Sequence, residues 1–561
     1  MNAGDSPRPG HRAWLQTWLP RLLVLGLALH FSRQVFPITA VEGDEQGIVN
    51  GVESWVRGSS DFGETSYLHA IQPGCYSLLF LLRESTGAPV LRIFGLASAV
   101  GAGLFVVFAS FLLADATSLR PAWVAVALLT LQEITAAAAY ANANAIAGAV
   151  LMAALLLSRR ADGALECALA GALLGAAGWL RLDSLLAAPA VLALRWSRRG
   201  FPAAARETAG IAAAAALVLV TAFELTRLSP LDAWADFSRR PDFSGWGPFR
   251  VRGPLVMGYA ASLVCAGGVA WLLARRLWRP LLLVFAGGAP SLIVYGGSLT
   301  TPKYLFYATP FLLLPGLLLL GHLLRPGGRD ARLRMSVGGV LIGLQVSELL
   351  FGVQTSSAAF RRFDPLPSLT LARRTIGAKT ASVGLGPGEA LPTDDGPRLR
   401  GGQFWSPALW RREKESMRRE CDRLDEVLGR PGSAAVVTSC YLSHQVLVHW
   451  LRSHGYKPGA PRFFGNGDAS SYITGWTAEN GRIVEALVNL TAHDVAEFRS
   501  SLDLGPRLLF LDDLGSLHGH RLMEGTGDWK RLSPSENGLL ALYELDRTGR
   551  LSTAEAGAAG R

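Results

Sequence analysis

The sequence predicts a mostly α-helical, polytopic membrane protein with about eleven spans, followed by a soluble α/β domain on the outer side. Hydrophobic residues make up 50% of the 561 residues and charged residues only 17%, whereas soluble domains carry about 25% charged residues. Apolar runs of about 20 residues, the length that crosses a bilayer, recur up to residue 355 and then stop. We therefore expect a membrane domain at 1–355, an extracytoplasmic domain at 356–550 and a disordered tail at 551–561.

The membrane domain contains eleven candidate spans, which place the two chain ends on opposite sides: 18–37, 90–113, 119–138, 143–158, 163–180, 183–196, 207–226, 254–274, 280–297, 303–323 and 335–353. The first run follows a basic N-terminus as a signal peptide does, but it continues without a clear cleavage site, so we expect an uncleaved helix. The runs 163–180 and 183–196 are short and form either two crossings or one re-entrant hairpin. The chain ends lie on opposite sides in both cases.

Basic residues predict the orientation, because cytoplasmic loops carry an excess of Lys and Arg. An N-terminus inside the cell collects 17 arginines in short cytoplasmic segments: Arg8, Arg12, Arg21, Arg120, Arg159, Arg160, Arg195, Arg198, Arg199, Arg206, Arg275, Arg276, Arg279, Arg325, Arg329, Arg332 and Arg334. We expect a multi-pass protein of the plasma or inner membrane with its C-terminal domain outside. A nucleic-acid partner is not expected, because the basic excess belongs to the apolar part rather than to a soluble face.

One outer loop departs from this rule. Residues 227–253 carry five arginines, among them Arg239 and Arg240, on the predicted outer side. Either the orientation fails locally, or the loop lies on anionic headgroups or binds a phosphate.

The part behind residue 355 predicts alternating strands and helices. Short apolar runs at 434–438, 507–511 and 539–545 indicate strands, and 410–428 and 440–454 have helical spacing, as in an α/β layer. Its two cysteines, Cys421 and Cys440, either form a disulfide or remain buried thiols. Asp394 and Asp395 lie in a glycine-rich loop, which is either a turn or a loop that binds sugar or acceptor.

Candidate chemistry begins directly after the first span, where Glu42, Asp44 and Glu45 place three carboxylates within four residues. Such a cluster is either a solvated turn or a general base assisted by a second carboxylate, which orients it or holds a divalent cation. His69 opens a segment that becomes apolar but is too short to cross a membrane, so we expect an interfacial helix there.

Ionisable groups within or beside the spans are either paired or mark a site. Most lie near the predicted outer face, which suggests a polar cavity opening outward; Glu166 lies near the inner end of its span. The outer groups are Arg33, Glu133, Arg181, Asp183, Glu224, Lys303 and Glu348.

An ordered set of motifs over about residues 15–355 resembles the GT-C superfamily of polytopic glycosyltransferases, which use polyprenyl-phosphate sugars and include protein O-mannosyltransferases and lipid A aminoarabinose transferases. The set comprises the acidic pair Asp44-Glu45 after the first span, the His69…Pro73…Tyr76 segment, Leu91-Arg92 opening the next span, Trp179-Leu-Arg181-Leu-Asp183, and Pro302-Lys303-Tyr304…Pro310-Phe311.

The resemblance implies that Asp44 is the general base, with Glu45 beside it; Glu42 or Glu45 is the alternative base. It implies a lipid-linked sugar donor and a lipid, glycan or protein acceptor. A cation must hold the donor phosphate, and we expect Lys303 together with one or more of Arg181, Arg239 and Arg240; alternatively, Lys303 only snorkels from its helix end. Further candidate site residues are His69, Asp183, Tyr304, Asp394 and Asp395.

The chain departs from the family pattern at one residue, and the metal requirement differs between members of the superfamily. Lys303 stands where the family more usually has arginine, which keeps the charge but loses the bidentate fork. Metal dependence is open, because the superfamily contains metal-using and metal-free members, so a divalent cation is a candidate cofactor.

Two other classes of protein compete with this hypothesis. A transporter or lipid flippase also carries charges inside a helix bundle, but a secondary transporter typically shows internal repeats with interrupted helices, and the sequence shows no such repeat. A membrane-anchored binding protein needs only one or two spans, which leaves the remaining apolar runs unexplained.

Overall fold

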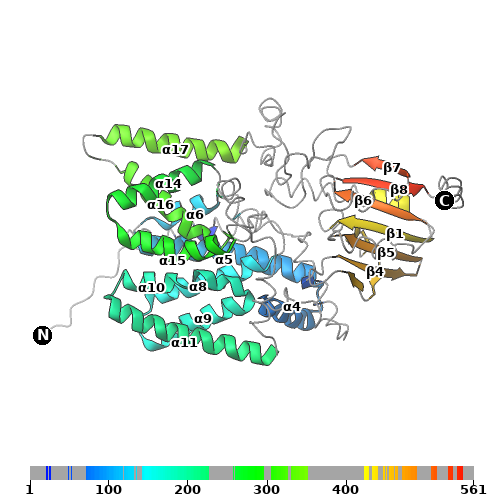
Figure 1. Cartoon of the computed structure of the whole chain (residues 1–561), viewed down its shortest axis with the longest axis horizontal. Helices are drawn as coiled ribbons and strands as arrows, with labels where there is room; N and C mark the ends of the chain where they lie inside the picture. The colour runs from blue at the N-terminus through cyan, green and yellow to red at the C-terminus, as the bar shows by residue number, and fades with distance from the viewer. Residues whose placement is uncertain are drawn as a thin grey trace, which may run out of the picture.

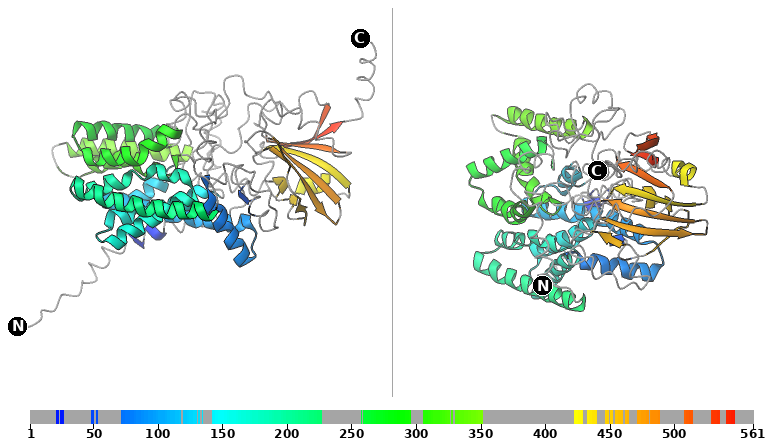
Figure 2. Two further views of the ribbon diagram at one scale, coloured as in Figure 1. Left: turned by 60° about the horizontal axis from the view of Figure 1, so that its bottom comes forward. Right: turned by 45° about the vertical axis from the view of Figure 1, so that its right-hand side comes forward.

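The computed structural model consists of a helix bundle and a separate twisted sheet (Figures 1 and 2). It describes residues 21, 22, 24–26, 48, 49, 52, 71–117, 119–129, 131, 134, 142–226, 257, 259–295, 305–325, 327, 330–351, 422–428, 432–439, 446–448, 450, 451, 454–459, 462–464, 471–479, 481–488, 507–513, 528–534 and 540–546.

The bundle is built from helices, and those from residue 90 onward fall on the predicted apolar runs. In chain order these are α4 (Pro73–Thr86), α5 (Val90–Thr117), α6 (Pro121–Leu129), α8 (Ala143–Arg160), α9 (Ala164–Leu180), the 3-10 helix η2 (Leu182–Ala187), α10 (Ala190–Trp196), α11 (Phe201–Thr226), α14 (Tyr259–Ala274), α15 (Trp278–Tyr295), α16 (Thr309–Leu323) and α17 (Ala331–Phe351).

Three described helices are long and apolar enough to cross a membrane: Arg92–Thr117, Ala143–Arg160 and Phe201–Leu225, with mean hydropathies of 2.3, 1.3 and 1.9. Only 17% of the most apolar window of the third helix is buried inside the protein, against 61% and 67% for the first two. An apolar helix that the protein leaves uncovered fits contact with lipid. The chain is therefore mostly helical in its first part, with several shorter apolar helices beside these three.

Small residues bring the helices of the bundle close together. A Cβ atom at Gly171 of α9 would lie 2.4 Å from the carbonyl oxygen of Ile211, and one at Gly175 would lie 2.6 Å from that of Ala215. Both carbonyls belong to α11, so one face of α9 packs directly on the α11 backbone. Glycine at these positions permits the close approach, as at interfaces between membrane helices.

Replacing Gly171 by alanine is expected to lower the free energy of unfolding by about 1–3 kcal/mol, because the new methyl group forces α9 and α11 apart. Gly210 of α11 provides the matched control, since a Cβ there meets nothing within 4 Å. Gly210→Ala should be neutral or stabilising by up to about 1 kcal/mol, because alanine favours helix more than glycine does. Thermal unfolding in detergent compares the two variants, and equal stability would contradict the close packing.

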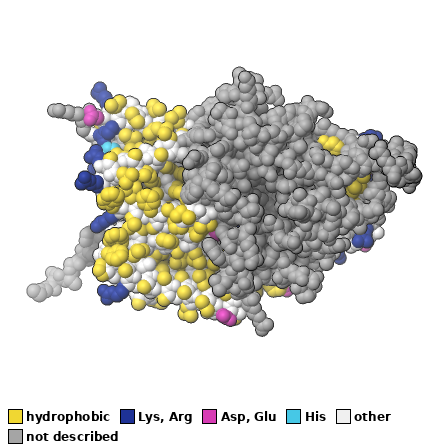
Figure 3. Space-filling model, in the orientation of Figure 1, with side chains coloured by type: hydrophobic (Ala, Val, Ile, Leu, Met, Phe, Trp, Pro, Cys, Tyr) yellow, Lys and Arg dark blue, Asp and Glu magenta, His cyan; other side chains and the backbone are white. Residues whose placement is uncertain are grey.

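One end of the bundle is rich in arginine, and we call it the arginine end. It contains the C-terminal ends of α8, α10, α14 and α16, the N-terminal ends of α11, α15 and α17, and the turns between them. Contacts tie these ends together: Arg160 pairs with Asp115 of α5, Trp271 stacks on His322, and Arg334 donates to the His322 carbonyl. Figure 3 shows these basic side chains along one edge, beside a broad apolar band.

The short run 183–196 returns along the bundle. After Arg181 ends α9, η2 and α10 carry the chain back until Arg195 donates to the carbonyl oxygens of Ser158 and Ala161 at 2.8 and 2.5 Å. Ala161 caps α8 and lies three residues before the start of α9, so α10 ends near the point where α9 begins. Helix α9 and the η2–α10 segment therefore extend over the same length of the bundle.

The C-terminal strands form one mixed sheet. Its strands are β1 (Gly432–Ser439), β2 (Lys457–Pro458), β3 (Arg462–Phe464), β4 (Ser471–Ala478), β5 (Gly481–Val488), β6 (Leu508–Asp513), β7 (Asp528–Pro534) and β8 (Leu540–Asp546). The order is β2-β4-β5-β1-β6-β8-β7, with β3 also paired to β4. Strand β1 runs parallel to β5 and β6, and the other pairs are antiparallel.

The strands predicted at 434–438, 507–511 and 539–545 correspond to β1, β6 and β8. Helix is also present within both predicted helical ranges, at 422–428 and at 446–451 where the residues are described. Alternating residues of β1 reach opposite faces: Val436 packs with Leu509 and Trp450, whereas Val437 packs with Phe510 and Ala486. The sheet is thus covered by apolar side chains on both faces.

Candidate functional site

A buried polar cluster joins the end of α9 to the start of α4, and we call its residues Gln72, Trp179, Arg181, Asp183 and Ser184 the Arg181 cluster. Arg181 caps α9, and its side chain is 3% exposed. Its Nε donates to the two carboxylate oxygens of Asp183 at 2.9 and 3.1 Å, and its Nη1 donates to Gln72 Oε1 at 2.9 Å. Gln72 precedes the first turn of α4, so one guanidinium connects three elements.

The local sequence explains why these groups meet. Pro73 occupies the first turn of α4, where a missing backbone N–H is tolerated, and Gln72 stands directly before it. Gly74 leaves room for the Trp179 ring, because a Cβ at this glycine would lie 2.6 Å from a ring carbon. This close approach of α4 and α9 brings the Gln72 amide to Arg181.

Three polar atoms of the Arg181 cluster are buried without a hydrogen-bond partner among the described residues: Gln72 Nε2, Trp179 Nε1 and Ser184 Oγ. The first two only donate, and the hydroxyl donates as well as accepts. Buried polar atoms are normally satisfied, so each such atom calls for an explanation, and a bound polar group is one. Donors beside a buried guanidinium favour an anionic or strongly polar group.

A second polar group lies at the same end of the bundle, at the start of α8. Asn142 caps this helix by accepting from the Ala145 N–H at 3.0 Å, and Ser98 of α5 donates to the Asn142 carbonyl at 3.0 Å. The buried Asn144 side chain has no hydrogen-bond partner for either its Oδ1 or its Nδ2 within the described part of the chain. Helix α8 also contacts η2, which carries Ser184.

Most residues predicted for the site lie outside the described residues: Glu42, Asp44, Glu45, His69, Arg239, Arg240, Lys303, Tyr304, Asp394 and Asp395, as do Cys421 and Cys440. Arg181 and Asp183 are described, and the structure brings them into contact. Glu224 is exposed on α11, so it contributes no buried charge, and Glu166 at the other end accepts from the backbone N–H groups of Asp162 and Gly163 before α9.

Two described segments lie next in sequence to the predicted catalytic and phosphate-binding residues. Ile48 and Val49 follow Glu45 by three and four residues, and both are completely buried in the core of the bundle. Phe306 follows Lys303 by three residues, is completely buried, and has its ring 4.2 Å from that of Phe105 of α5. The chain is thus anchored in the bundle directly after both predicted motifs.

Among the described residues, no group of three His, Cys, Asp or Glu side chains is arranged to hold a metal ion. The carboxylates for which a divalent cation was considered, Glu42, Asp44 and Glu45, are outside this part of the chain.

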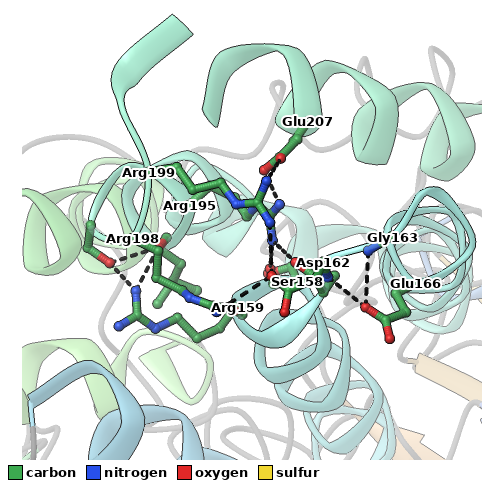
Figure 4. A network of polar contacts seen from close by, with 12 residues as sticks. Ser158, Arg159, Asp162, Gly163, Glu166, Arg195, Arg198, Arg199 and Glu207 are labelled. Atoms are coloured by element: carbon green, nitrogen blue, oxygen red, sulfur yellow. Dashed lines mark hydrogen bonds and ion pairs between the residues drawn. The ribbon is translucent and has the colours of Figure 1, made fainter. Parts of the chain in front are cut away.

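A second polar network lies at the arginine end (Figure 4). Arg199 pairs with Asp162 at 2.8 Å and with Glu207 at 2.6 Å, and Arg195, which is 1% exposed, also pairs with Glu207. Arg159 donates to the Leu194 carbonyl at 2.9 Å and Arg198 to the Arg159 carbonyl at 2.6 Å. These arginines close the ends of α8 and α10 and hold the turns of three helices together.

No family model matches the chain, and no curated protein matches it either. The sequence indicated Trp179 only as the first residue of the Trp179-Leu-Arg181-Leu-Asp183 motif, and it did not indicate Gln72 or Ser184 as parts of a site. Ser184 directly follows this motif, which was the available signal, whereas Gln72 is 109 residues distant from Arg181 and joins it only through folding.

Proposed function

We propose that the chain is an integral membrane glycosyltransferase that moves a sugar from a polyprenyl-phosphate carrier to an acceptor at the extracytoplasmic face. Asp44 acts as the general base, with Glu45 beside it. Lys303, Arg181, Arg239 and Arg240 hold the donor phosphate. The acceptor is a lipid, a glycan or a protein, and the chain crosses the membrane about eleven times with its N-terminus in the cytoplasm.

The distribution of charge supports this orientation. The described arginines at the ends of α8, α10, α14 and α16 gather at one end of the bundle, as expected for a cytoplasmic side. The Arg181 cluster and the cap of α8 lie at the other ends of their helices. The proposed reaction therefore takes place opposite the arginine end.

The buried, incompletely satisfied Arg181 cluster is the observation that carries the proposal. A lipid-linked sugar presents a phosphate and a sugar ring at the membrane surface. A protein binds both through N–H and O–H groups that are not already engaged in other hydrogen bonds. Arg181 supplies a guanidinium group, which is paired with Asp183, while Gln72, Trp179 and Ser184 carry the atoms without described partners. The complete burial of Ile48 supports a fixed position for the preceding carboxylates.

A transfer assay tests the proposal. The purified full chain, inserted in one orientation into sealed vesicles, is offered a small panel of polyprenyl-phosphate sugars with candidate acceptors. We expect at least one donor to be consumed with release of polyprenyl phosphate on the side opposite the arginine end. A protein that moves a lipid-linked sugar across the membrane without cleaving it would instead be a transporter or flippase, and the proposal would be wrong.

A further inference from the structure

The arginine end divides into two halves that differ in charge compensation. In one half, part of which Figure 4 shows, the arginines lie among acidic residues: Arg199 pairs with Asp162 and Glu207, Arg195 with Glu207, Arg198 with Asp162, and Arg160 with Asp115. The other half, formed by the α14–α15 turn and the α16–α17 turn, carries six arginines that form no ion pair among the described residues. We call them the uncompensated arginines: Arg275, Arg276, Arg279, Arg325, Arg332 and Arg334.

The second half lacks acids because the sequence provides almost none. Asp330 is the only acidic residue between residues 254 and 347, and it is exposed. The two turns lie close together, since Trp271 of α14 stacks on His322 of α16, and Arg334 of α17 donates to the His322 carbonyl. Arg334 donates to carbonyl oxygens of the turn, and five of the six arginines are exposed.

Helix stability does not explain these positions. Arg279 lies in the first turn of α15, and Arg332 and Arg334 lie in the first turn of α17. A positive charge at a helix N-terminus opposes the helix dipole and is normally unfavourable. Arg276, moreover, has a positive φ of 55°, a left-handed conformation that glycine adopts with less strain. Four arginines therefore occupy positions that the local backbone disfavours.

The surroundings of the uncompensated arginines are those of a lipid surface. Trp278, which is 63% exposed, stands between Arg276 and Arg279, and tryptophan is enriched at the level of lipid headgroups. Further along the same helices, Phe285 of α15 and Val340 of α17 are also exposed, as are Leu333 and Met335 next to the arginines. Such apolar side chains fit acyl chains, which places lipid phosphates at the height of the arginines.

We propose that the uncompensated arginines bind the headgroups of anionic phospholipids in the leaflet on the arginine side. Six cations against one aspartate favour a lipid with net negative charge over a zwitterionic one, although both contain a phosphate. Guanidinium groups suit this partner because they contact phosphate oxygens in a bidentate manner. The inference rests on the proposed membrane embedding and is independent of the transfer reaction.

The test measures which lipid the full chain retains. The protein in detergent is equilibrated with mixed micelles of equal amounts of phosphatidylglycerol and phosphatidylcholine, separated by gel filtration, and its bound lipids are quantified by mass spectrometry. The wild-type chain should retain phosphatidylglycerol in clear excess. The variant Arg275→Gln/Arg279→Gln/Arg332→Gln leaves the strained Arg276 untouched. Its ratio of bound phosphatidylglycerol to bound phosphatidylcholine should be at least about tenfold lower than that of the wild type, since each arginine near a lipid surface raises the affinity for anionic lipid about fivefold.

A matched control removes three exposed basic residues from the sheet, Lys457→Gln/Arg482→Gln/Lys530→Gln, and changes the net charge equally. It should keep the wild-type preference. Equal loss in both variants would assign the effect to overall charge, and retention of both lipids alike by the wild-type chain would indicate a different partner, such as an acidic protein segment; either result overturns the proposal. If the triple variant aggregates, Arg279→Gln alone replaces it, with an expected loss of about fivefold.

Discussion

Replacing Arg181 by methionine is expected to lower the free energy of unfolding by about 3–5 kcal/mol. The substitution removes the guanidinium, and with it the ion pair to the Asp183 carboxylate, which is 12% exposed, and the hydrogen bond to Gln72 Oε1. An uncompensated charge in a buried position costs more than the ion pair itself contributes, because the charge keeps its desolvation penalty. Unfolding of the detergent-solubilised protein measures the loss.

Two comparisons separate this effect from a general sensitivity to arginine loss. The double variant Arg181→Met/Asp183→Leu removes both charges and should recover most of the stability, since apolar replacement of a buried pair is often neutral. Arg160→Met breaks the more exposed pair with Asp115, in which the arginine side chain is 50% exposed, and should cost at most about 1 kcal/mol. If the single and double variants at Arg181 were equally unstable, the buried charge would not be the cause.

The double variant also tests the proposed role of Arg181 in binding the donor. A folded protein without the Arg181–Asp183 pair should need a higher donor concentration for transfer if the guanidinium contacts the phosphate. If the donor concentration needed for transfer did not change, the role of Arg181 would be limited to joining α4, α9 and η2. Lys303, Arg239 and Arg240 would then remain the candidates for binding the donor phosphate.

The helices were predictable because each is a long apolar run, and length and hydropathy alone define such a run. Three strands of the sheet were predictable, whereas β5, which lies between β4 and β1, was not. Strands β1, β6 and β8 are apolar, whereas β7 is a polar edge strand that pairs with β8 only, and edge strands carry little hydrophobic signal. The β4–β5 hairpin escaped prediction although Asn480-Gly481, a dipeptide typical of tight hairpin turns, stands in the sequence where β5 begins.

The site was predictable only where a charge interrupts an apolar run. Arg181 and Asp183 attracted attention for this reason, and the structure pairs them. Gln72 gave no such signal, because an uncharged polar residue before a proline is ordinary in sequence and becomes part of the cluster through the packing of α4 on α9. Likewise, the sequence placed many arginines at one end of the bundle but did not reveal which are neutralised, since Arg160 and its partner Asp115 belong to different helices.

Replacing Asp44 by asparagine is expected to reduce the rate of sugar transfer by about 10²–10⁴-fold, the usual effect of losing a general base. Asparagine keeps the shape and the hydrogen-bonding capacity of the side chain but removes its basicity. The acceptor hydroxyl or amine then retains its proton during attack on the anomeric carbon, whereas departure of the phosphate as a stable anion is unaffected. Transfer by the purified variant, compared with its thermal stability, measures the effect.

Glu45→Gln and Glu42→Gln are the matched controls, since each removes one carboxylate from the same four residues. We expect a smaller loss of rate for both, because each variant keeps Asp44, the proposed general base. A folded Asp44→Asn protein with a normal rate, beside an inactive Glu45→Gln protein, would exchange the two roles. If all three variants transferred sugar normally, the carboxylates would form only a solvated turn, and a base would have to be sought elsewhere in the chain.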